Sequence, residues 1–225
     1  MNDLKKKTIG GLVFLFFAMA ACLFIPVWTL RYWQAWVLMA VFFVSGGLTT
    51  LYLWRHDRKL LERRASGGPT AEKEKSQQLI QLIAGLGFVG LLIVPALDHR
   101  FMWSHVPTIV NILGDALILF GEFAIFIVFK QNTFASATIE LAPEQHVIST
   151  GLYGIVRHPM YAGAFFLLVG IPLALGSWWG LLVIVAMMPA LIWRLIDEEK
   201  FLVKNLPGYA EYRTRVRYRL IPFVW

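Results

Sequence analysis

Six long apolar stretches constrain the fold of this chain more than any other feature. A helix of about 20 apolar residues spans the roughly 30 Å hydrocarbon core of a bilayer and satisfies its own backbone hydrogen bonds there. Of the 225 residues, 58% are hydrophobic and only 16% are charged. We therefore predict an all-α integral membrane protein with about six transmembrane helices and the lipid bilayer as its partner. The stretches cover residues 8–30, 33–54, 79–97, 108–129, 160–175 and 181–196.

The last two stretches are short, and the five residues 176–180 that join them include two glycines and two tryptophans. This pattern predicts a short C-terminal helical hairpin with aromatic residues at the membrane interface. We accordingly divide the chain into an N-terminal four-helix transmembrane region, residues 1–129, and a C-terminal region, residues 130–225. The second region would comprise a long connection, the hairpin and a tail.

The distribution of Lys and Arg predicts the orientation in the membrane. Nineteen of the 21 basic residues lie before the first stretch or in alternate connections, and only Arg31 and Arg100 lie in the others. Because basic residues are retained in the cytoplasm, we expect both termini there. The net charge of +7 is then a topology signal with attraction to anionic lipid, so nucleic-acid binding is not expected. The single cysteine, Cys22, excludes an intrachain disulfide and a multi-cysteine metal centre, and no metal site is expected.

The charged connection at residues 55–78 contains Ser66, Gly67, Gly68 and Pro69. Such a composition is typical of a solvated loop. We expect little catalytic content in it.

Two other cytoplasmic segments, residues 130–159 and 197–225, flank the hairpin and can together form a cap over its inner mouth. The first ends in a cluster of Gly, Tyr, Arg and His residues that leads into Pro159. Proline suits the first turn of a helix, so His158, Tyr161 and the free N–H groups of a helix start are expected at the membrane surface. Groups of this kind bind polar ligand atoms.

The second segment follows Arg194 and opens with Asp197, Glu198 and Glu199. Arg194 and Glu198 are four residues apart and share one helix face, so one interpretation of the pair is a surface ion pair. A half-buried arginine at a membrane boundary favours a ligand-binding role. Further on, Pro207 and Gly208 predict a turn before a short helix, and the basic, aromatic end of the tail is expected to lie along the lipid headgroups.

Taken together, these motifs resemble a known family. The pattern Gly-Leu-Tyr-x3-Arg-His-Pro-x-Tyr-x-Gly covers residues 151–163, Arg-x3-Glu-Glu covers residues 194–199, and the Tyr- and Arg-rich tail ends in Ile-Pro-Phe at residue 223. This ordered set is similar to that of the isoprenylcysteine carboxyl methyltransferases and their phospholipid and thiol methyltransferase relatives. The resemblance extends over about residues 133–223, and the four N-terminal helices carry no recognisable signature.

The resemblance implies an enzyme that transfers a methyl group from S-adenosylmethionine and releases S-adenosylhomocysteine. It places residues 145–148 along the adenosine or ribose, Glu198 on the ammonium or ribose, and Arg194 toward the methyl acceptor. The residues that it assigns to cofactor binding are Gln145, His146, Val147, Ile148, Tyr153, His158, Pro159, Met160, Tyr161 and Glu198.

The expected chemistry depends on the acceptor. The methyl group of a sulfonium is already activated, so the protein mainly has to position the acceptor and exclude water. Arg194 can orient a carboxylate with two parallel hydrogen bonds, and this makes an isoprenylcysteine-like carboxylate the preferred acceptor. For a phospholipid amine or a thiol, Glu199, His158 or Tyr161 would have to remove a proton. Arg194 and Glu199 are thus the predicted catalytic residues.

Two other functions compete with methyl transfer. Similar motifs occur in membrane sterol-type reductases that use NADPH, although Pro159 and Met160 stand where those proteins carry an Asn. A transporter is suggested by Asp115 and Glu122, two carboxylates within an apolar stretch. Gly163 and Gly170 would either allow close helix packing or leave a lateral opening for a prenyl or acyl tail.

Overall fold

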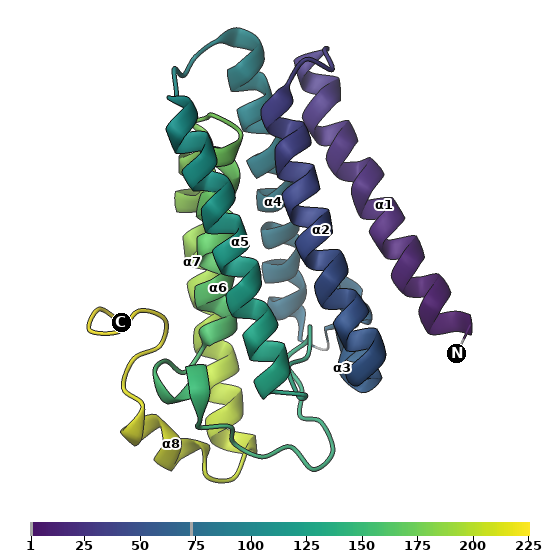
Figure 1. Ribbon diagram of the computed structural model, residues 1–225. Coiled ribbons are helices and arrows are strands. Elements are labelled where there is room, and N and C mark those ends of the chain that lie inside the picture. Colours follow the sequence, from purple (N-terminus) through teal and green to yellow (C-terminus); the bar gives the residue numbers. More distant parts are fainter. Residues whose placement is uncertain (1, 73) are drawn as a thin grey trace.

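The computed structural model describes residues 2–72 and 74–225, and in this part of the chain the regular structure is entirely helical (Figure 1). The prediction of an all-α integral membrane protein is therefore confirmed. The α-helices are α1 (Asn2–Val27), α2 (Trp33–His56), α3 (Arg58–Ala65), α4 (Lys75–Phe101), α5 (Thr108–Gln131), α6 (Pro159–Ala174), α7 (Gly180–Asn205) and α8 (Tyr209–Arg215), and the 3-10 helices are η1 (Pro69–Ala71) and η2 (Gly151–Gly154).

Five helices, α1, α2, α4, α5 and α7, are long and apolar enough to cross a membrane, and α6 is a shorter apolar helix of 16 residues. At 1.5 Å per residue, α6 is about 24 Å long, less than the hydrocarbon thickness. The expectation of a short final helix was wrong, because α7 has 26 residues. Hydropathy marks only the part of a helix that lies in lipid, and α7 continues through the charged residues beyond it.

Glycines bring α5 and α6 into close contact. A Cβ atom at Gly114 would lie 2.2 Å from the backbone nitrogen of Ala174, and one at Gly163 would lie 3.0 Å from the carbonyl oxygen of Gly121. Gly170 meets the carbonyl of Gly114 in the same way. Gly163 and Gly170 therefore serve close packing of the helix backbones, and the lateral opening expected as an alternative does not lie there.

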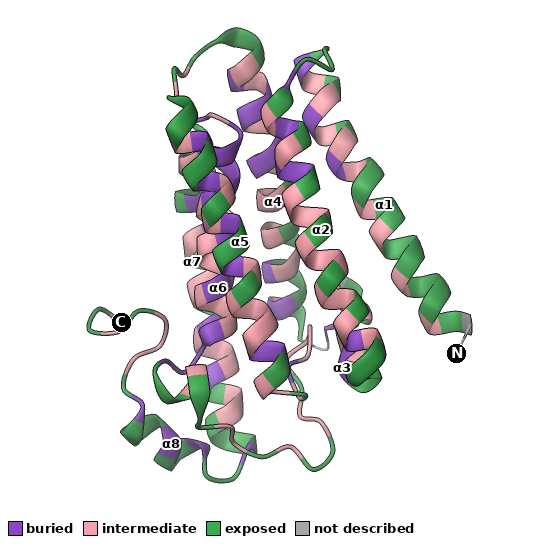
Figure 2. Cartoon of the chain, in the orientation of Figure 1, coloured by how far each residue is buried: buried purple, intermediate pink, exposed green. Residues whose placement is uncertain are grey.

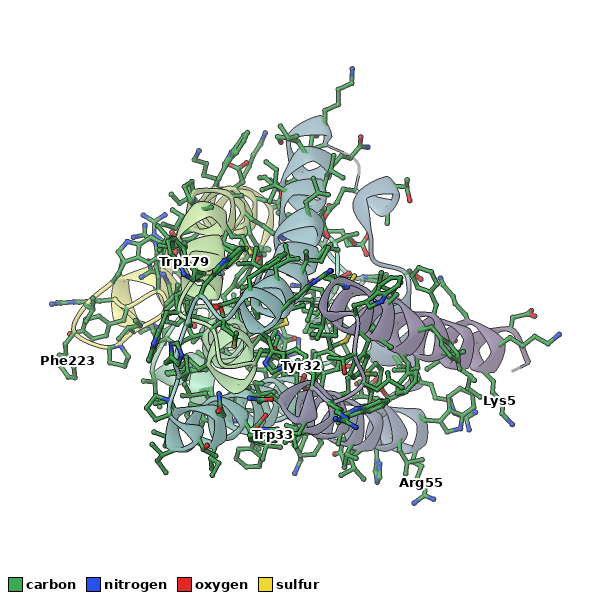
Figure 3. All side chains as sticks on the ribbon, turned by 90° about the horizontal axis from the view of Figure 1, so that it is seen from above. Lys5, Tyr32, Trp33, Arg55, Trp179 and Phe223 are labelled. Carbon is green, nitrogen blue, oxygen red and sulfur yellow. The ribbon has the colours of Figure 1, made fainter. Side chains whose placement is uncertain are left out.

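One hydrophobic core joins both regions of the chain, with Leu38 of α2, Leu91 of α4, Ile118 of α5 and Ile171 of α6 all fully buried. The N-terminal half of α1 diverges from the other helices and is largely exposed (Figures 1 and 2). In the view along the helices, Tyr32 lies toward the centre, whereas Lys5 and Arg55 project outward (Figure 3). An apolar exposed surface of this kind is suited to contact with lipid.

The segments that were predicted to be cytoplasmic gather at one end of the bundle. The N-terminus, α3, the connection between α5 and α6, and α8 all lie there (Figure 1). We call this the basic end, and we call the other end, which holds the connections α1–α2, α4–α5 and α6–α7, the opposite end. The alternation of basic and non-basic connections in the sequence is thus matched by their separation in space.

Candidate active site

A cavity of about 500 Å³ lies at the basic end. Its walls come from α3, α4, α6, α7, α8 and the connection between α5 and α6. This volume lies within the roughly 300–1,000 Å³ of small-molecule sites.

The start of α6 is held in place by the C-terminal tail. His158 is the N-cap residue and Pro159 begins the helix, as predicted. The backbone N–H groups of Arg157 and His158 donate to the carbonyls of Tyr218 and Arg219, both at 2.9 Å. The tail therefore folds back onto the Arg-His-Pro motif, whereas it was expected to lie along the headgroups. The predicted turn and short helix before it are present, with Gly208 in the left-handed region at φ 81°.

A buried charge network stands behind this motif. Glu199 is 3% exposed, and its two oxygens accept from Nε of Arg157 at 2.6 Å and from Nε of Arg219 at 3.0 Å. Arg157 also donates through Nη1 to the carbonyls of Val216 and Arg217. Both oxygens of Glu199 are bonded within the protein, and Glu199 does not line the cavity, although Arg157 does. The network ties α7, the motif and the tail together.

Glu198, the neighbouring carboxylate, faces the cavity instead. Its Oε2 atom accepts a hydrogen bond of 2.5 Å from the hydroxyl of Tyr161. The ring of His158 meets the ring of Tyr161 edge-on, and the Nε2 atom of His158 is buried without a hydrogen-bond partner. That nitrogen lies 3.7 Å from Oε1 of Glu199, beyond hydrogen-bond distance. The cavity wall thus carries one carboxylate, that of Glu198, and the ring of His158, whose Nε2 atom is buried on the side of Glu199.

Arg194 lines the cavity, but its ion-pair partner is not Glu198 on the same helix. Its Nη2 atom lies 2.8 Å from Oε1 of Glu72 and donates to the carbonyl of Ala137 at 3.0 Å, while Nη1 donates to Gln77 at 3.1 Å. Glu72 is 4% exposed. The expectation that residues 55–78 form a solvated loop was wrong, because this segment packs against the connection after α5 and supplies the carboxylate for Arg194.

Eleven of the twelve residues singled out from the sequence line this one cavity, and the exception is Glu199. They come from separate segments that only the fold brings together. The eleven are Gln145, His146, Val147, Ile148, Tyr153, His158, Pro159, Met160, Tyr161, Arg194 and Glu198.

Sequence reasoning missed several polar residues of the cavity. Asn132 donates a 2.8 Å hydrogen bond to the hydroxyl of Tyr153. Burial, with a smaller contribution from Glu198, raises the pKa of Tyr153 to about 12. Arg64 and Gln81 also line the cavity, and both lie outside the recognised motifs. A lone Arg or Gln in a charged connection gives no signal of its own, so these residues could be found only in three dimensions.

Fold and site together define a helical integral membrane protein with a cavity at one end of its bundle that is lined by both polar and apolar residues. Residues 109–207, a little under half of the chain, match the phospholipid methyltransferase family, in agreement with the resemblance of the motifs. The match indicates a membrane methyltransferase and favours this class over the sterol-type reductase and the transporter. None of the curated proteins matches the chain at a significant level.

Proposed function

We propose that this protein transfers methyl groups from S-adenosylmethionine and that the reaction takes place in the cavity at the basic end. The observation that carries the proposal is the convergence on one cavity of all ten residues expected to bind the cofactor. We further propose that residues 130–225 carry the transfer chemistry and that residues 1–129 support and complete the site.

The residues present fit such a cofactor. S-adenosylmethionine carries an ammonium group, ribose hydroxyls and an adenine ring, and it needs both carboxylate and apolar contacts. Glu198 supplies a carboxylate at the cavity wall, and the buried Nε2 atom of His158 is a polar atom that lacks a partner. Val147, Ile148 and Met160 supply apolar contacts around them. We assign Glu198 to the ammonium or ribose and residues 145–148 to the adenosine.

When bound, S-adenosylmethionine supplies a methyl group already activated on a sulfonium. The protein orients the acceptor and excludes water. In this proposal Tyr161 fixes the carboxylate of Glu198 through its hydrogen bond, and Arg194 orients an acceptor carboxylate with its free donors. Glu199 has both oxygens committed to Arg157 and Arg219, so we assign it a positioning role in place of proton removal. For an amine or thiol acceptor, His158 takes the proton.

We propose a lipidic acceptor. A small apolar groove of about 50 Å³ runs between α6 and α7, and its lining includes Phe165, Leu168 and Met188. Tyr161, Ala164 and Leu191 line both this groove and the main cavity. A hydrocarbon tail lying in the groove would leave its polar end at the cavity. The preferred acceptor is an isoprenylcysteine-like carboxylate, and the family match makes a phospholipid amine the second candidate.

A methyl-transfer assay in lipid nanodiscs tests this function. Labelled S-adenosylmethionine is offered with a prenylated cysteine, with phosphatidylethanolamine or with a small thiol. S-adenosylhomocysteine binding is measured separately by calorimetry. We expect Glu198→Gln to weaken that binding at least about tenfold, through loss of a charge-assisted contact, while the exposed control Glu211→Gln leaves it unchanged. Wild-type protein that binds no S-adenosylhomocysteine would refute the proposal.

We also propose that the basic end faces the cytoplasm, because in the sequence 19 of the 21 Lys and Arg residues belong to the N-terminal, alternate connecting and C-terminal segments predicted to be cytoplasmic. Single cysteines introduced in a Cys22→Ser background test this. An impermeant thiol reagent applied to intact cells should label His105→Cys at the opposite end and spare Glu211→Cys. The reverse labelling pattern would invert the assignment.

A further inference from the structure

The segment of residues 58–72, which precedes the region matched by the family, forms one wall of the cavity. Gly67 lies so close to the connection after α5 that a Cβ atom there would be 2.5 Å from Cβ of Ala137. Arg64 and Gly68 line the cavity. The site is therefore completed by a part of the chain that carries no methyltransferase motif.

Arg64 differs from the other arginines of the site in having no carboxylate partner. Its Nη1 atom donates to the carbonyl of Ser136 at 2.9 Å and lies 3.9 Å from Sδ of Met160, and its guanidinium group stands 5.3 Å from the centre of the Phe129 ring. Within residues 2–72 and 74–225, no Asp or Glu oxygen lies within 4.0 Å of it. By contrast, Arg194 is paired with Glu72.

An uncompensated guanidinium at a partly buried position is costly, since arginine stays charged in proteins. Burial lowers the pKa of Arg64, and the neighbouring charge of Arg194 acts in the same direction. The nearby Tyr161 and Glu198 oppose this effect without forming an ion pair with Arg64. A negatively charged group of a bound ligand would therefore stabilise the guanidinium group of Arg64.

The two arginines lie side by side. Arg64 from α3 donates to the carbonyl of Ser136, and Arg194 from α7 donates to the carbonyl of the next residue, Ala137. Among the described residues, the Nε and Nη2 atoms of Arg64 make no hydrogen bond, so two directions of its planar donor fork remain free. This arrangement suits a carboxylate or phosphate, whose oxygens accept such forks in pairs.

We propose that Arg64, beside Arg194, forms an oxyanion subsite that binds a carboxylate or phosphate group of the methyl acceptor. This proposal rests on the proposed function and narrows the acceptor to a lipid that carries a carboxylate or phosphate group. In a prenylated cysteine the bound group is the carboxylate that receives the methyl group. In a phospholipid it is the phosphate next to the amine. A neutral thiol would gain nothing from the subsite.

Matched ligand pairs test the subsite without relying on turnover. The first pair is N-acetyl-S-farnesylcysteine and its neutral methyl ester, and the second is phosphatidylethanolamine and diacylglycerol with the same acyl chains. Binding to the full-length protein in detergent micelles is measured for wild type, Arg64→Gln and Arg64→Lys. We expect wild type to bind the member that carries the carboxylate or phosphate more tightly in at least one pair. Arg64→Gln should lower the affinity for that member at least about tenfold and leave the affinity for the other member unchanged.

Arg63 provides the matched control. It is the neighbouring arginine of α3, it donates to the carbonyl of Thr133 and it does not line the cavity. Arg63→Gln changes the net charge equally and should keep the discrimination between ligands with and without the carboxylate or phosphate group. Arg64→Lys retains the charge and should keep part of the discrimination between the two ligands of a pair.

Other outcomes overturn the inference in distinguishable ways. If Arg64→Gln binds the members with the carboxylate or phosphate as tightly as wild type does, Arg64 has no role in anion binding. If Arg64→Gln instead loses affinity for S-adenosylhomocysteine and retains the acceptor discrimination, the oxyanion is the carboxylate of the cofactor. If wild type binds neither S-adenosylhomocysteine nor the members with the carboxylate or phosphate preferentially, the proposed function fails together with this subsite.

Discussion

The two ends of the bundle use buried polar groups differently. At the opposite end, Asp98 is 1% exposed and accepts from the backbone N–H and hydroxyl of Ser104, both at 2.6 Å, and from the hydroxyl of Ser177 at 2.5 Å. Ser177 in turn accepts from the backbone N–H of Gly180. These bonds tie the end of α4 to the turn of the α6–α7 hairpin. The group is satisfied internally and leaves nothing for a ligand.

At the basic end, the polar groups surround a cavity, and some of them have no partner. His158 has a buried nitrogen without a hydrogen bond, and Arg64 has no counterion among the described residues. Behind this wall, however, Glu199 is as fully bonded as Asp98. Saturated polar networks around Asp98 and Glu199 thus hold the hairpin at both ends. Buried groups without a partner occur at both ends, since Gln34 and Asp115 have such atoms near the opposite end, and only at the basic end do they adjoin the large cavity.

The largest change in the free energy of unfolding should come from disrupting the hydrogen-bonded network around Glu199 at the basic end. Glu199→Ala leaves Arg157 and Arg219 without their shared carboxylate, and breaking a buried ion pair in this way costs about 3–5 kcal/mol. We expect that loss of unfolding free energy in detergent micelles, measured by thermal and denaturant unfolding. The exposed Glu62→Ala serves as the control. An unchanged stability would show that the network contributes little to the fold.

The matching change at the opposite end is Asp98→Ala. It removes the acceptor for three hydrogen bonds and leaves the donors of Ser104 and Ser177 buried, at about 1–3 kcal/mol for each unsatisfied group. We expect about 3 kcal/mol of destabilisation in total, with unchanged affinity for S-adenosylhomocysteine in the folded fraction. A specific loss of that affinity would mean that the two ends are coupled and would break the comparison.

A smaller effect is expected from the helix seam near the opposite end. Gly114→Ala would push a methyl group against the backbone of Ala174, and overpacking of this kind costs about 1–3 kcal/mol. Gly47→Ala on α2 is the matched change, because a Cβ atom there meets nothing within 4 Å. It should leave stability unchanged or raise it slightly. Equal melting temperatures for the two variants would argue against a tight seam.

The smallest effect concerns Tyr153 at the cavity wall. Tyr153→Phe loses the hydrogen bond from Asn132, worth about 1 kcal/mol at neutral pH. Separately, burial raises the pKa of Tyr153 to about 12 in the folded protein, against about 10 in an unfolded chain, while the hydrogen bond from Asn132 acts in the opposite direction. The stability linked to this raised pKa is complete below pH 10 and is lost as the pH rises toward 12. The free energy of unfolding, measured with denaturant over this pH range, should therefore fall less steeply with pH for Tyr153→Phe than for wild type. Parallel curves would exclude this role.

Much of the fold and of the candidate site could be predicted from local patterns in the sequence. Apolar length predicted the helices, and the spacing of Pro159, Tyr161 and Glu198 within the motifs singled out residues that share one cavity. The errors arose where distant segments meet. Along the sequence the visible partner for Arg194 is Glu198 on its own helix, but Arg194 pairs with Glu72 from a segment expected to be a solvated loop. A charge pattern cannot reveal this, because an i to i+4 neighbour is visible in sequence whereas a partner on another element is not.

The sequence by itself determined the membrane class, the separation of basic and non-basic connections, and the motif residues, because hydropathy, charge and short-range spacing are local properties of the chain. Only the tertiary structure decided which polar groups are satisfied and which remain free. Gln77 and Arg194 are bonded although they lie 117 residues apart, and Arg64 reaches the cavity because α3 packs against the connection after α5. Burial and partner choice depend on helix packing, which brings distant residues together.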